Sequence, residues 1–182
     1  MRSTGSHAGT AFGGGHRNSP RLLWLVPILL ALHNAEEAIF FPRYLPFVLA
    51  RLPTGWQAVA GPVTSGQVWI ALALVTATAF LVAVWVERHP ASALGRWILL
   101  LFQATLLINA LWHVAAAVVL FGGYAPGLAT ALLLNLPFSI YLLHRARAER
   151  WVSARALWAL VPAALLVHGP LLSALLLATE RI

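Results

Sequence analysis

The feature that most constrains this chain is an apolar run from Leu22 to Phe41 that carries ionisable side chains near its end. About 20 apolar residues, each rising about 1.5 Å in a helix, cross the hydrocarbon of a lipid bilayer. The ionisable residues in the run are His33, Glu36 and Glu37. A charged side chain at bilayer depth costs about 3 kcal/mol, so we expect these carboxylates to find partners in other spans.

The composition places the chain among integral membrane proteins. Of its 182 residues, 60% are hydrophobic and only 9% are charged, whereas a soluble domain carries about 25% charged residues. The chain has no cysteine, which excludes disulfides, thiol catalysis and cysteine-ligated zinc. Every basic residue is arginine, and this bias, together with many alanines and leucines, suggests a GC-rich bacterial genome.

The net charge of +7 could suggest a nucleic-acid partner. The arginines, however, are scattered over short segments between apolar runs and do not line one element. We therefore expect no nucleic-acid partner, and we use the arginines to predict membrane topology.

Five apolar segments are long enough to cross a bilayer, which predicts an all-α, polytopic membrane helical bundle. We expect residues 1–20 to form a disordered tail and residues 21–182 to form a single domain. Pro42 is expected to end the first span, because proline disfavours helix in the residue before it, and an interfacial linker should follow. The predicted spans are residues 22–41, 64–85, 96–120, 127–143 and 155–177.

Arginine distribution predicts the orientation of this bundle. With five spans, nine of the twelve arginines fall on the side of the N-terminus and three on the other side. Because cytoplasmic loops carry the excess of arginine, we expect a cytoplasmic N-terminus and an outside C-terminus. The expected location is the inner (cytoplasmic) membrane of a bacterial cell, with the lipid bilayer as a partner.

Polar residues of different spans fall at similar depth. Counted from the span ends, Glu36, Asn109, His113 and His168 gather in one layer slightly outside the bilayer midplane. His33, Glu36 and Glu37 share one helix face by their i, i+3 and i+4 spacing, as do Asn109 and His113. Pro170 should kink the last helix and widen a cavity beside His168. The sequence therefore predicts a single site, and it leaves open whether Asn135 and Arg43 contribute.

The pattern H-x-x-E-E in the first span, with N-x-x-x-H over Asn109–His113 in a later one and a further histidine in the last, resembles the bacterial HXXEE family. These are small integral membrane proteins named for that motif. The resemblance extends over the predicted membrane portion, roughly residues 22–178. The family has no settled activity, so the resemblance implies a site and leaves the reaction unnamed.

The residue types in the predicted site suit a divalent metal. Imidazole and carboxylate are ligands for zinc, iron(II) or manganese, and a cation would also neutralise buried carboxylates. The candidate ligands are His33, Glu36, Glu37, His113 and His168. A glutamate outside the ligand set could act as a general base, so Glu36, Glu37 and Asn109 are the candidate catalytic residues. This predicts a membrane-embedded, metal-assisted enzyme with a lipophilic small-molecule substrate, whether hydrolase, oxidase or isomerase.

Three other interpretations use the same residues. Without a metal, one glutamate of the Glu36 and Glu37 pair should hold a proton, and the pair could serve an acid–base isomerase or cyclase of an isoprenoid-like substrate. A small transporter or proton relay would also place ionisable groups inside the membrane. Finally, the polar groups could join the spans through interhelical hydrogen bonds, although two adjacent acids are not needed for that purpose. Homo-oligomerisation is compatible with each interpretation.

Overall fold

The computed structural model describes residues 20–51, 54 and 63–179, and within them it contains helices and no strand. Five of its helical segments are long and apolar enough to cross a membrane, which confirms the predicted all-α class and number of spans. Most of the predicted tail, residues 1–19, lies outside the described part. Which end of the bundle faces the cytoplasm stays a prediction. The helices are α1 (Pro20–Arg51), α3 (Ser65–Arg88), α4 (Ala93–Ala116), η1 (Ala117–Phe121), α5 (Leu128–Thr130), η2 (Ala131–Asn135), α6 (Leu136–Ala148), α7 (Ala154–Leu166), η3 (Val167–Leu171) and α8 (Leu172–Ala178).

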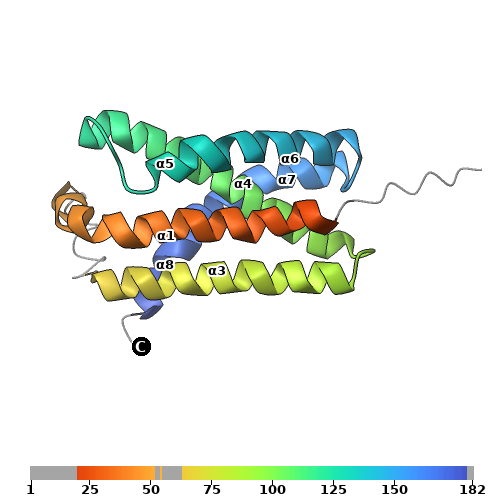
Figure 1. Cartoon of the computed structure of the whole chain (residues 1–182), viewed down its shortest axis with the longest axis horizontal. Coiled ribbons are helices and arrows are strands. Elements are labelled where there is room, and N and C mark those ends of the chain that lie inside the picture. The colour runs from red at the N-terminus through yellow and green to blue at the C-terminus, as the bar shows by residue number, and fades with distance from the viewer. Residues whose placement is uncertain (1–19, 52–53, 55–62, 180–182) are drawn as a thin grey trace, which may run out of the picture.

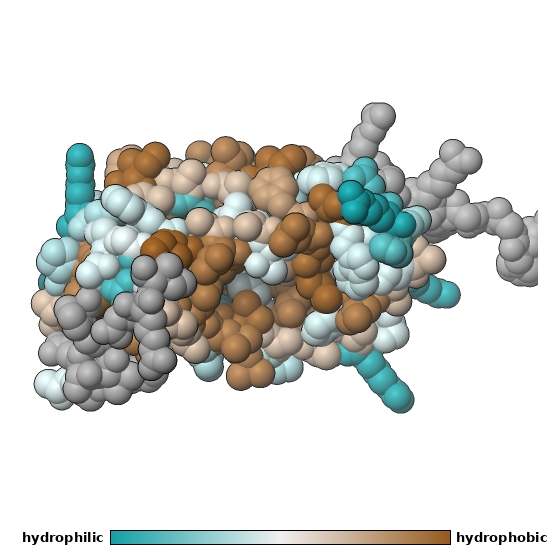
Figure 2. Space-filling view, turned by 90° about the horizontal axis from the view of Figure 1, so that it is seen from below, coloured by the Kyte–Doolittle hydropathy of each residue, from teal (hydrophilic) through white to brown (hydrophobic). Residues whose placement is uncertain are grey.

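The spans form one bundle. Figure 1 shows α1 between α3 and the span made of α5, η2 and α6, with α4 and the oblique last span behind it. Polar residues start three of the helices, because Thr64, Ser92 and Ser153 each accept a hydrogen bond from the first helical turn. Figure 2 shows hydrophilic residues at both ends of one face and an apolar middle, as a membrane-spanning bundle requires.

Helix α1 does not end where the sequence predicted. It continues past Phe41 and through Pro42 and Pro46 to Arg51, so the expected end of the first span and start of the linker were wrong. Pro42 has no N–H and therefore leaves the carbonyl of Ala38 without its usual helical donor. The indole Nε1 of Trp69 on α3 donates to that carbonyl at 2.9 Å. A neighbouring span thus replaces the bond that proline removes, and the helix continues.

Large and small apolar residues pack the interior. Leu23 and Val26 of α1 meet Leu99 and Leu100 of α4 and Leu142 of α6 in one buried cluster. Fully or nearly fully buried alanines occur on each of the four spans that follow α1 in the chain, and these small side chains let the helices approach closely. This packing fixes the positions of α1, α4 and the α5–η2–α6 span, which carry the polar site.

Three spans contain a π-helical segment, and each contains or closely follows a polar residue of the site region. One follows His113 at Ala117–Phe121, one follows Thr130 at Ala131–Asn135, and one contains His168 at Val167–Leu171. Pro170, which was predicted to kink this helix, explains the last of these segments, because it removes a helical donor. Wide turns of this kind are frequent at functional sites of helices.

Candidate metal centre

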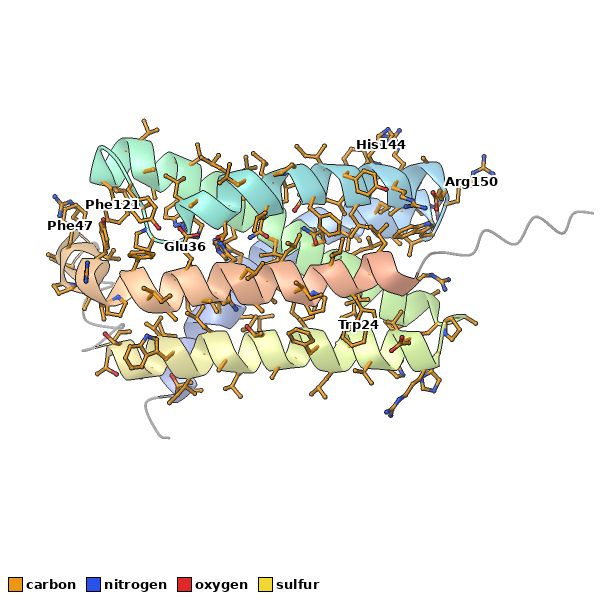
Figure 3. The ribbon with its side chains drawn as sticks, in the orientation of Figure 1. Trp24, Glu36, Phe47, Phe121, His144 and Arg150 are labelled. Carbon is orange, nitrogen blue, oxygen red and sulfur yellow. The ribbon has the colours of Figure 1, made fainter. Side chains whose placement is uncertain are left out.

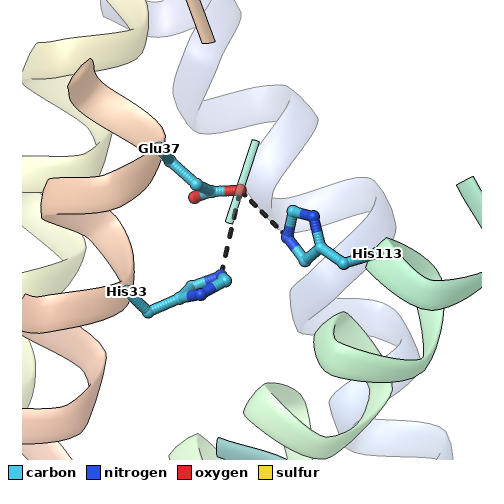
Figure 4. Close-up of side chains that lie close together, drawn as sticks. All are labelled: His33, Glu37 and His113. Carbon is cyan, nitrogen blue, oxygen red and sulfur yellow. Dashed lines mark ion pairs between the residues drawn. The ribbon is translucent and has the colours of Figure 1, made fainter. Parts of the chain in front are cut away.

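His33 and Glu37 of α1 and His113 of α4 form a compact cluster inside the bundle. One ligand atom from each residue lies within 4.8 Å of the other two. Glu37 Oε1 is 3.1 Å from His113 Nε2 and 3.9 Å from His33 Nε2 (Figure 4). The i, i+4 spacing brings the first two side chains together on α1, and the packing of α4 against α1 adds the third.

The orientation of His113 fits a metal ligand. Its Nε2 atom is buried and has no hydrogen-bond partner, although Glu37 Oε1 lies 3.1 Å away. Two atoms that bind one zinc ion in a tetrahedral arrangement, each about 2.1 Å from it, lie about 3.4 Å apart. The 3.1 Å separation of His113 Nε2 and Glu37 Oε1 is close to that value, while His33 Nε2, 3.9 Å from Glu37 Oε1, would have to move inward. The donor set of two imidazoles and a carboxylate is one that zinc and iron(II) accept.

Hydrogen bonds assign the tautomer of His33. Its Nδ1 atom lies 2.8 Å from the hydroxyl of Thr130, which in turn donates to Glu36 Oε2 at 2.6 Å. Because the threonine proton is used toward the carboxylate, His33 Nδ1 is the donor to Thr130. The lone pair of a neutral His33 is then on Nε2, the atom that faces Glu37. Asn109 Nδ2, 2.5 Å from Nε2, donates to that lone pair.

Glu36 holds the start of the fourth span. Its oxygens accept from the backbone N–H of Ala129 at 3.1 Å, from the N–H of Thr130 at 2.7 Å and from the Thr130 hydroxyl. The hydroxyl of Tyr124 donates to the same carboxylate. These four donors suit an ionised carboxylate, which only accepts hydrogen bonds, at a helix N-terminus. Figure 3 shows Glu36 between α1 and the beginning of α5.

The H-x-x-E-E motif therefore divides between two tasks. Glu37 and His33 enter the cluster, whereas Glu36 lies behind His33 and reaches it through Thr130. In the described part of the chain the two carboxylates do not contact each other, so the structure does not bring them together as a proton-sharing pair. A ligand histidine usually donates its other N–H to an oxygen that fixes its ring, and Thr130 with Glu36 has this position.

Gly127 lets the loop between the third and fourth spans approach both histidines. Its φ is +83°, and a Cβ atom there would lie 2.8 Å from Cε1 of both His33 and His113. Only glycine fits both the left-handed backbone and the close approach. The loop thus closes one side of the cluster.

Two apolar cavities lie on the other side of the cluster, between α1, α3, α4 and the last span. The smaller one, called the apolar cavity below, has a volume of about 180 Å³ and is lined by residues that include Leu30, Val75, Phe102, Leu106 and Leu175. The larger one, called the mouth cavity below, has a volume of about 470 Å³ and is lined by residues that include Phe41, Val68, Trp112, His113 and Leu176. Both share five lining residues, namely Glu37, Leu72, Asn109, His168 and Leu172.

The remaining sequence candidates lie at different distances from this centre. His168 lines both cavities opposite Glu37 but is outside the three-residue cluster. Asn135 is fully buried and neither of its amide atoms has a hydrogen-bond partner in the structure. Arg43 is exposed on the extension of α1.

Sequence reasoning missed Thr130, Tyr124 and Gly127. Burial and the hydrogen bond to Glu36 raise the pKa of Tyr124, so its hydroxyl keeps the proton that it donates. The only signal for these residues was the turn Tyr124–Gly127 directly before an apolar helix, since a helix N-terminus offers free N–H groups to an anion.

Comparison with known proteins agrees with the motif. A family model described as "Protein of unknown function with HXXEE motif" matches residues 24–142. The uncharacterised protein YrkK of Bacillus subtilis is 34% identical over 116 residues, which cover 64% of this chain and 68% of that protein. No solved structure matches. The matched stretch contains the whole cluster and Thr130 but ends before His168, so it is shorter than the resemblance expected from the sequence. The chain belongs to the HXXEE family of proteins of unknown function.

Proposed function

We propose that this protein is a membrane-embedded, metal-dependent enzyme that acts on a lipophilic substrate. The observation that carries the proposal is the cluster of His33, Glu37 and His113, whose ligand atoms lie within 4.8 Å of one another at the wall of two apolar cavities. Two carboxylates inside the first span are costly in a bilayer. Glu36 is compensated by four donors, and a cation would compensate Glu37.

The residues take separate roles in this proposal. His33, Glu37 and His113 hold a zinc, iron(II) or manganese ion, which supplies Lewis acidity toward a substrate oxygen. Thr130 and Glu36 fix the ring of His33 and keep its Nε2 lone pair on the ligand side. Asn109 donates to His33 Nε2 in the structure, and once a metal takes that lone pair its amide is free to donate a hydrogen bond to the substrate.

His168 is the candidate general base. It lies across both cavities from α1, and its imidazole is outside the ligand set. Imidazole exchanges protons near neutral pH, and a base on the opposite wall can reach a substrate that lies between it and the cluster. The fifth span would then contribute chemistry, whereas the first and third spans would contribute the metal site.

A metal-free acid–base enzyme is the weaker candidate. It needs one glutamate of the pair to hold a proton, but the four donors around Glu36 suit an ionised carboxylate and already use both of its oxygens. Transport would need a path through the bundle, and the described cavities lie on one side of the cluster.

Elemental analysis of detergent-purified protein tests the proposal. Wild type should carry stoichiometric zinc, iron or manganese, and Glu37→Gln and His113→Ala should lose it. His144→Ala is the matched control, because His144 is an exposed histidine at the far end of α6 and should leave metal content unchanged. A wild-type protein that binds none of the three metals, and gains no thermal stability when they are added, would contradict the proposal.

A further inference from the structure

The two cavities share a polar wall, and beyond it most of their lining is apolar, with Asn34 and Thr105 as the further polar residues of the apolar cavity and His113 as that of the mouth cavity. Glu37, Asn109 and His168 lie where the cavities meet. From there the apolar cavity extends toward Leu30 and Phe102, and the mouth cavity extends toward Phe41 and Leu176. A molecule that fills both cavities would therefore have its polar group in its middle.

The charges of the residues that line the two cavities limit which head groups this molecule can carry. Among the described residues of either cavity the only acidic side chain is Glu37, and none is arginine. Described arginines such as Arg51, Arg88 and Arg145 lie at the ends of the helices. A phosphate or carboxylate head group would therefore meet the cation of the proposed cluster alone, with no guanidinium to share its charge, at a depth where a charge is costly.

The volume of the apolar cavity admits a single chain. An enclosed site of about 150 Å³ holds one benzene molecule, and the apolar cavity is about 180 Å³. One aliphatic segment occupies this volume, and a second acyl chain would lie outside it. The larger mouth cavity takes the part of the molecule on the other side of the polar group.

We infer that the substrate is an uncharged, single-chain lipid whose reacting group, a carbonyl, ester or alkene, lies within the chain and is flanked by apolar segments. The inference rests on the proposed function, because it takes the cluster of His33, Glu37 and His113 as the reacting centre. The lipid passes Leu72 and Leu172, and its central group faces Glu37, Asn109 and His168.

Ligand binding to the detergent-purified, full-length protein tests the substrate class. Native mass spectrometry compares laurone, a symmetrical ketone with a central carbonyl, with laurate and dodecyl phosphate, which carry a terminal charge on a similar alkyl chain. We expect one laurone per protein, bound about a hundredfold more tightly than dodecyl phosphate. Laurate or dodecyl phosphate binding as tightly as laurone would overturn the inference.

A pair of variants tests the location. Leu172→Trp fills the junction of the cavities and should weaken laurone binding about tenfold. Leu166→Trp adds the same side chain at an exposed position, six residues earlier, that lines neither cavity, and it should bind laurone like wild type. Equal laurone affinity in both variants would place the lipid elsewhere and refute the assignment.

Metal analysis of the same samples separates this inference from the proposed function. If laurone is preferred but no metal is bound, the cavity assignment stands and the proposed enzyme chemistry fails. If metal is bound but laurone is not preferred, the substrate class alone fails. The wild-type comparison of the three ligands does not depend on how well either tryptophan variant folds.

Discussion

Glu36 and Glu37 are neighbours in sequence, yet their carboxylates serve different spans. Glu37 Oε1 lies 3.1 Å from His113 Nε2 of α4, whereas Glu36 Oε2 accepts the N–H of Thr130 at 2.7 Å at the start of the fourth span. One side chain is satisfied by four protein donors, and the other faces two imidazoles and a cavity. The two glutamates of the motif should therefore respond differently to the same substitution.

Glu36→Gln should cost stability, and Glu37→Gln should not. A glutamine at position 36 turns an NH₂ donor toward groups that are themselves donors, which costs about 1–3 kcal/mol of unfolding free energy. Glu37→Gln removes a charge at bilayer depth and should leave the melting temperature unchanged or raise it in metal-free protein. Thermal unfolding in detergent, after treatment with a chelator, checks both.

The metal affinities of Glu36→Gln and Glu37→Gln distinguish a residue that positions a ligand from a residue that binds the metal itself. Glu37→Gln should abolish metal binding, while Glu36→Gln should lower affinity by about 10–100-fold by loosening His33 through Thr130. Thr130→Val removes the connecting hydroxyl and should resemble Glu36→Gln. If Glu36→Gln and Thr130→Val bound metal like wild type, the chain from Glu36 to His33 would have no positioning role.

Gly127→Ala should destabilise the protein more than Gly122→Ala. Both glycines have positive φ, so each alanine costs about 1–2 kcal/mol in backbone conformation. Only at Gly127 would the new Cβ also press on His33 and His113, which adds about 1–3 kcal/mol, whereas at Gly122 it meets no atom within 4 Å. Melting temperatures and metal content of the two variants measure the difference. Equal losses would mean that the loop can move away from the histidines.

The sequence was sufficient for the spans and for most of the cluster. Hydropathy located the five helices, and the i, i+4 rule together with depth brought His33, Glu37 and His113 together. The sequence was not sufficient for Glu36, because two of its four donors are backbone N–H groups that no side chain signals. The rule that residues i, i+3 and i+4 share a helix face also assigned the adjacent positions i+3 and i+4 to one site, although adjacent side chains point about 100° apart around a helix.

Tyr124 should make the stability of the protein sensitive to alkaline pH. Burial and the bond to Glu36 raise its pKa above the ordinary value of about 10. The folded protein then holds this proton more tightly than the unfolded chain, so the stabilisation is complete below about pH 10 and declines as the pH rises above it. Melting temperature measured across this range should fall less steeply in Tyr124→Phe. Tyr141→Phe removes a hydroxyl that contacts Arg145 and should keep the wild-type slope.

The stability lost by substituting Trp69 should depend on whether Pro42 is present. Trp69→Phe keeps the aromatic ring but leaves the carbonyl of Ala38 without a donor, because Pro42 supplies none. In a bilayer or detergent micelle this should cost about 1 kcal/mol. Pro42→Ala restores the helical N–H, so Trp69→Phe should cost much less in a Pro42→Ala background. A double-mutant cycle on melting temperatures measures this coupling. Additive effects would mean that the indole does not replace the missing helical bond, and the continuation of α1 to Arg51 would then need another cause.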